Sequence, residues 1–119
     1  MSYDRKKTMP LVPGLRLLPW TTQEGNPCFL STEGKTGVLA SLADEVESEQ
    51  LRDADGILKD GQAVLNDDES GEHATRHTLK ATLSALSDAL RVADSRGARL
   101  PDPYDEDGEG PQLPAEAFG

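Results

Sequence analysis

Aromatic side chains, cysteine and positive charge are all scarce in this sequence of 119 residues. It has one Trp, two Tyr, two Phe and one Cys, and twelve Lys and Arg stand against 22 Asp and Glu. A single cysteine cannot form an internal disulfide. The formal net charge of −10 disfavours direct binding to the phosphates of nucleic acid. A composition this poor in aromatics allows only a small aliphatic core, which makes a homodimer or another protein partner an expectation.

Long apolar runs are missing as well. No run approaches the roughly 20 residues that span a bilayer, and we find no charged-then-apolar leader with a cleavage site. We therefore expect a cytoplasmic protein without membrane contact. Its charge is uneven, because residues 1–35 carry five basic against three acidic side chains, whereas residues 36–119 carry seven against nineteen. The acidic part favours encounter with a basic protein partner.

The few aromatic and sulfur-containing side chains gather in the stretch PWTTQEGNPCFLST, residues 19–32. Two apolar segments there flank a short connection with turn chemistry, which predicts a β-hairpin over residues 15–32. Pro19 belongs on the edge of such a ribbon because it lacks a backbone donor. We expect Trp20 and Phe29 to cover an open side of the helices. If they are partly exposed, they are also the kind of aromatic anchor that interfaces favour.

Apolar residues at three- and four-residue steps predict two helices, over residues 36–66 and 71–97. A short acidic turn joins them, so they form a long antiparallel hairpin. The predicted fold is α+β and mainly α, with the β-hairpin packed on the helical hairpin in one domain over residues 14–100. Residues 1–13 are expected to form a flexible arm. The proline-rich acidic tail, residues 101–119, is expected to be disordered.

The most specific pattern is a row of four leucines in the second helix. Leu79, Leu83, Leu86 and Leu90 step by four, three and four residues, so they share one helical face; we call them the leucine row. The favoured interpretation is packing against the first helix. The other is a shared surface for a dimer, in a four-helix arrangement, or for another protein. Together with Trp20, these leucines and Phe29 are the candidate partner-binding residues.

Signals for chemistry are weak. His73 and His77 lie four residues apart on one helical face, a spacing that suits Zn²⁺, but Ala74 and Arg76 break the H-E-x-x-H pattern of metalloproteases. The two histidines are therefore only weak metal candidates. Cys28 has no basic neighbour in sequence to activate a thiolate. With no catalytic constellation, we expect neither an enzyme nor a cofactor.

Three segments resemble a known group of proteins. They are PGLRLLPWTTQEGNPCFLST, SLADEVESEQL and LSDALRVADSRGARLP, which together span about residues 13–101. The stretch resembles small uncharacterised proteins of Streptomyces-type actinobacteria, which occur beside helix-turn-helix regulators. The resemblance implies a regulatory accessory role, and it carries no catalytic residues with it.

These observations predict a cytoplasmic protein-binding accessory or regulatory protein that acts through an apolar helical stripe and an acidic surface. Its partner is expected to be a protein, with a DNA-binding regulator as one candidate. Two alternatives stay open. One is a small metal-binding protein or enzyme that uses His73 and His77 or Cys28. The other is an acidic anti-repressor that mimics nucleic acid, with residues 101–119 as its binding segment.

Overall fold

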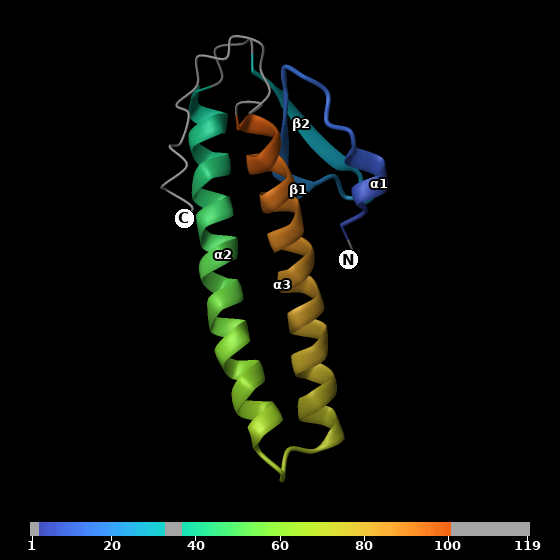
Figure 1. Ribbon diagram of the computed structural model, residues 1–119, viewed down its shortest axis with the longest axis vertical. Coiled ribbons are helices and arrows are strands. Elements are labelled where there is room, and N and C mark those ends of the chain that lie inside the picture. Colours follow the sequence, from blue (N-terminus) through green and yellow to red (C-terminus); the bar gives the residue numbers. More distant parts are fainter. Residues whose placement is uncertain (1–2, 33–36, 101–119) are drawn as a thin grey trace, which may run out of the picture.

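The computed structural model describes residues 3–32 and 37–100. In chain order these form α1 (Arg5–Thr8), β1 (Leu15–Thr21), β2 (Pro27–Ser31), α2 (Gly37–Asn66) and α3 (Glu72–Arg99). The two long helices run antiparallel, and the β-hairpin and α1 lie beside them at the end where α2 begins and α3 ends (Figure 1). The predicted fold class, a β-hairpin packed on a long two-helix hairpin, is confirmed. The expected disordered tail, residues 101–119, lies outside the described residues.

The β-hairpin closes through a turn that suits its sequence. Thr22 and Asn26 are joined by a backbone hydrogen bond of 2.9 Å across the turn, and Gly25 has φ of +85°, a conformation that glycine adopts without strain. The antiparallel register pairs Leu17 with Phe29 and Thr21 with Pro27 and is irregular between these two pairs. Pro19 lies in this irregular part, as expected of a residue that lacks a ladder donor.

Small side chains line the contact between the two long helices. A Cβ built on Gly61 of α2 would lie 3.6 Å from the Cγ2 atom of Thr78 on α3, an ordinary contact distance, so these two positions face each other across the helix pair. Residues three, four, seven or eleven positions away share the face of their reference residue. The face of Thr78 therefore also carries half-buried alanines, at positions Ala74, Ala81 and Ala85. The face of Gly61 carries Ala54, Ile57 and Val64.

The core forms where the β-hairpin meets both helices. Its buried apolar residues are Leu17 and Leu18 of β1, Ala43 of α2 and Val92 of α3. Ser95 joins them, because its hydroxyl donates a 2.7 Å hydrogen bond to the backbone oxygen of Leu17. The hairpin is thus attached to α3 by both apolar packing and a buried hydrogen bond, which a lone two-stranded ribbon needs for stability.

A buried carboxylate lies beside this core. Glu47 of α2 is fully buried, and its Oε1 atom accepts contacts from three arginines: Arg16 at 3.4 Å, Arg96 at 3.2 Å and Arg99 at 3.4 Å. Arg16, itself 7% exposed, also pairs with Asp44 at 2.6 Å. These side chains come from β1, α2 and α3, so one charged cluster ties together all three elements of the hairpin contact.

The amino-terminal segment differs from the flexible arm expected over residues 1–13. Asp4 caps the short helix α1 by accepting a hydrogen bond from the backbone of Lys6. Arg5 then forms two hydrogen bonds, of 2.9 and 2.8 Å, with the carboxylate of Asp94 on α3, and the Tyr3 hydroxyl donates a third, of 2.9 Å. The prediction missed this attachment because its partner lies about ninety residues away in sequence.

Candidate protein-binding surface

The leucine row does not lie where the favoured interpretation placed it. Leu79, Leu83 and Leu86 are 56%, 58% and 54% exposed, and Leu90 is half-buried. The expectation that this row packs against the first helix is wrong. The physical reason is that α3 turns the face of Thr78 and its alanines, rather than the leucine face, toward Gly61 of α2.

A second set of exposed leucines lies on α2. Leu51, Leu58 and Leu65 follow one another at seven-residue steps and are 38%, 60% and 83% exposed. A seven-residue step returns a side chain to nearly the same side of a helix, so these three share one face. Exposed apolar rows thus lie on both neighbouring helices, and an exposed apolar patch in a globular protein marks a place of interaction.

The aromatic candidates lie on the β-hairpin, at the other end of the molecule from the helical turn. Trp20 of β1 is half-buried, and Phe29 of β2 is 39% exposed. The neighbouring Leu17 and Leu18, at 1% and 5%, carry most of the burial that attaches the hairpin to the helices. Trp20 and Phe29 remain candidate anchors, distinct in place from the leucine row.

The weak metal candidates lie at the start of α3, in the exposed first turns. His73 and His77 are both exposed. Over residues 3–32 and 37–100, no group of three or more His, Cys, Asp or Glu side chains is placed to hold a metal ion. Cys28 of β2 is a half-buried free thiol, with neither histidine near it along the chain. The described structure thus adds no third ligand to the histidine pair.

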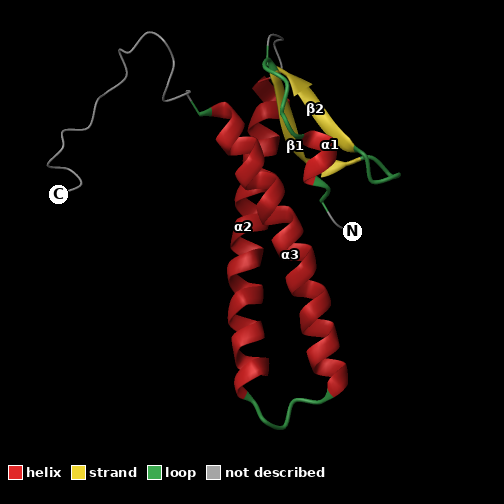
Figure 2. Ribbon diagram, turned by 45° about the vertical axis from the view of Figure 1, so that its right-hand side comes forward, coloured by secondary structure: helices red, strands yellow, loops and turns green. Residues whose placement is uncertain are grey.

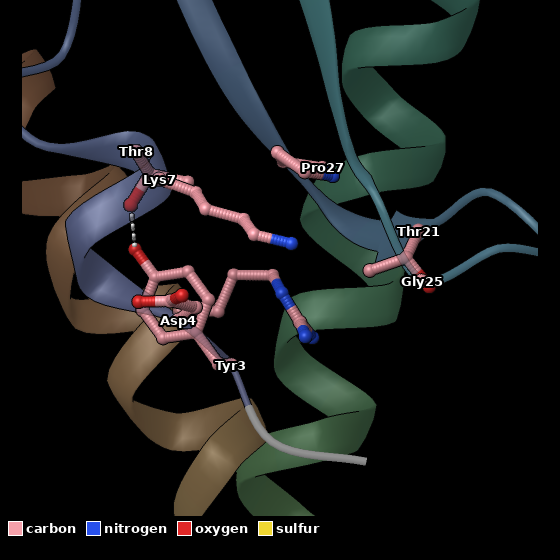
Figure 3. A pocket seen from close by; sticks show the side chains of 8 residues that line it. Tyr3, Asp4, Lys7, Thr8, Thr21, Gly25 and Pro27 are labelled. Carbon is pink, nitrogen blue, oxygen red and sulfur yellow. Dashed lines mark hydrogen bonds between the residues drawn. The ribbon is translucent and has the colours of Figure 1, made fainter.

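A small hollow of about 50 Å³ opens between α1, the β-hairpin turn and α3. Figure 3 shows the Lys7 side chain extending across it and Tyr3 at its edge, joined to Thr8 by a 2.7 Å hydrogen bond. Pockets for drug-sized ligands measure about 300–1,000 Å³. The hollow has room for little more than ordered water.

The attachment of the amino-terminal segment beside this hollow perturbs two ionisations. The hydrogen bond from Arg5 lowers the pKa of Asp94, because it stabilises the ionised carboxylate. Burial raises the pKa of the Tyr3 hydroxyl above its ordinary value. The Arg91 guanidinium lies 5.2 Å from the centre of the Tyr3 ring, within the range of a cation–π contact. These groups hold the segment on α3 and do not form a reactive pair.

Charge divides the two long helices. α2 carries seven acidic and two basic side chains, whereas α3 carries five basic and three acidic ones. Among the residues that the structure describes, the excess of acidic side chains is therefore concentrated on α2 and on the Asp67, Asp68 and Glu69 turn. The leucine row lies on the more basic helix and the second set of leucines on the more acidic one.

Neither a family model nor a curated protein nor a solved structure matches this chain. In the described part of the chain, no helix is both long and apolar enough to cross a membrane.

Proposed function

We propose that this chain is a cytoplasmic protein-binding accessory or regulator, with no reaction of its own, and that the leucine row is its main contact surface. The observation that carries the proposal is the exposure of Leu79, Leu83 and Leu86, each more than half open to solvent on a regular helix. Helical faces with leucines at such steps are typical of surfaces that bind another helix.

The acidic surface supports the same role. Six exposed acidic side chains on α2 and three in the turn that follows it give this part of the protein a negative surface. Such a surface accelerates encounter with a basic protein and repels phosphates. A DNA-binding regulator, whose own surface is basic, is a partner with the matching charge.

The test compares what full-length protein retains from a lysate of the source organism. The bait is the wild-type chain, the variant L79Q/L83Q/L86Q, or a matched control with equally exposed residues changed elsewhere, V12Q/V38Q/L100Q. We expect wild type and control to retain one protein in stoichiometric amount, with less at high salt, and the leucine variant to lose it. Equal retention by all three baits would reject the leucine row as the contact surface.

A further inference from the structure

The distal half of the helical hairpin, which we define as residues 48–66 and 72–86, contains no buried residue. The buried residues of α2 and α3 all lie outside it: Ala43, Glu47, Ser87, Arg91, Val92 and Ser95. Both views show the reason, since α1, β1 and β2 accompany only the other half of the helices (Figures 1 and 2). Within one chain, the residues that face each other between its two helices are only half-buried.

The same half carries the exposed leucines. Leu51, Leu58 and Leu65 of α2 lie here, as do Leu79, Leu83 and Leu86 of α3. Most helical stability in proteins comes from packing of an apolar face rather than from intrinsic propensity. In the distal half Ile57 and Val64 are half-buried, but the six leucines stay exposed. Packing within one chain therefore contributes little here, and the distal half has the composition of a helix pair covered by something else.

We propose that a second copy of this chain covers the distal half, with α2 of each copy lying against α3 of the other in an antiparallel four-helix bundle. This inference rests on the proposed function, because it names the partner of the same leucine row. A twofold dimer presents one patch to itself, so each contact between α2 and α3 occurs twice.

Charge favours this pairing over the alternatives within a dimer. Within the distal half, α2 carries four acidic and two basic side chains, and α3 carries one acidic and two basic ones. Placing α2 against α2 of the second copy brings like charges together, which costs free energy, whereas placing α2 against α3 brings opposite charges together. Within one chain the helices already show that such a pairing is compatible with their charges.

The available area is also of the right size. A face two helices wide, about 20 Å, and about 25 Å long covers roughly 500 Å² in projection. Accessible surface that follows side chains is larger than a projection, so this face falls between the small interfaces of transient complexes and the ~800 Å² per partner of a standard interface. Leu51, Leu58 and Leu65 of α2 and Leu79, Leu83 and Leu86 of α3 supply the exposed apolar side chains of this half.

The first test is the molar mass of the full-length protein by light scattering after size-exclusion chromatography, over a dilution series. We expect twice the mass of one chain for wild type and for V12Q/V38Q/L100Q, and the mass of one chain for L79Q/L83Q/L86Q. That variant loses six leucines per dimer. If each half-exposed leucine contributes roughly fivefold to the dissociation constant, the dissociation constant of the dimer rises more than a thousandfold. A wild-type monomer at 100 μM protein, taken as roughly the upper working range, overturns the proposal, as does a dimer that survives the three substitutions.

Two further readouts complete the design. Far-UV circular dichroism of L79Q/L83Q/L86Q must still show a helical protein that unfolds cooperatively, which separates loss of the dimer from loss of the fold. The dimer dissociation constant is then measured against salt: weaker association at high salt supports α2 against α3, and stronger association at high salt overturns that arrangement.

The outcomes also separate the two proposals. A monomer that still retains another protein through its leucines overturns the second-copy inference and keeps the accessory role. A leucine-dependent dimer that retains nothing else keeps the second-copy inference and overturns the accessory role.

Discussion

Replacing Glu47 with Gln tests whether the buried charge cluster holds the β-hairpin on the helices. Glu47 is the only carboxylate that the three arginines Arg16, Arg96 and Arg99 share among the described residues, and its side chain is 1% exposed. The change to Gln keeps the size of the side chain and removes its charge. It leaves Arg16 buried with less compensation, although Asp44 still pairs with it at 2.6 Å.

The structure sets the magnitude. Removing one partner of a buried ion pair costs about 3–5 kcal/mol, because an uncompensated charge stays buried. Two of the three arginines reduce that cost, since the side chains of Arg96 and Arg99 are 45% and 32% exposed and can turn to water. The remaining cost falls on Arg16. We therefore expect the free energy of unfolding of Glu47→Gln to drop by about 2–3 kcal/mol.

The assay is urea unfolding at fixed protein concentration, followed by circular dichroism for the helices and Trp20 fluorescence for the β-hairpin. With a slope of about 1–1.5 kcal/mol per molar urea, the midpoint falls by about 2 M. Glu45→Gln, an exposed position on the same helix, is the control and stays within about 0.5 kcal/mol of wild type. A Glu47→Gln midpoint equal to that of Glu45→Gln would refute the reasoning, because the three contacts would then contribute nothing measurable.

The remaining predictions use the same unfolding assay. Arg5 lowers the pKa of Asp94, so this contact stabilises the folded state above the ordinary carboxylate pKa of about 4, and the stabilisation is lost as pH falls through the lower folded pKa. Asp94→Asn removes that part of the pH dependence, and an unchanged profile of stability against pH would contradict the contact. Gly61→Ala places its Cβ in ordinary contact with Thr78 at 3.6 Å and stabilises α2 by about 1 kcal/mol. Gly61→Leu pushes the helices apart and destabilises the protein by more than about 1 kcal/mol. Equal stability of the two variants would contradict the contact between Gly61 and Thr78. Ser95→Ala removes the buried donor to β1 and costs about 1–3 kcal/mol, and a loss below about 0.5 kcal/mol counts against that hydrogen bond.

Local sequence signals predicted where the helices and strands lie in the chain, but not which face of each helix packs against its neighbour. Periodicity placed the two helices, and turn chemistry placed the β-hairpin, because both depend on residues close in the chain. The leucine row shows the limit. A repeat of three and four residues shows which side chains share a face, and it does not show which of two faces meets the neighbour. The face of Thr78 repeats with the same period, and in the structure it is this face that lies opposite Gly61 of α2.

The charged cluster and the amino-terminal attachment were beyond sequence reasoning for a different reason. Glu47 looks like one more acidic residue on a polar helix face, and nothing near it in sequence marks it as buried. Its arginine partners lie 31, 49 and 52 residues away, on β1 and α3. Tyr3 and Asp94 likewise meet only after the chain has folded. Contacts of this range leave no periodic signal in one sequence.

The long reach of these contacts has a consequence for synthesis. The last residue of the β-hairpin to be synthesised is Ser31. The hydroxyl that donates a hydrogen bond to β1 belongs to Ser95, and the carboxylate that pairs with Arg5 belongs to Asp94. Ribosomes extend chains at about 5–20 residues per second, so some 60 further residues take about 3–12 s. During that interval the ribbon and its Trp20 have no α3 to dock on, and two strands alone are barely stable. Protection of this first segment in the cell therefore depends on how quickly the end of α3 leaves the ribosome.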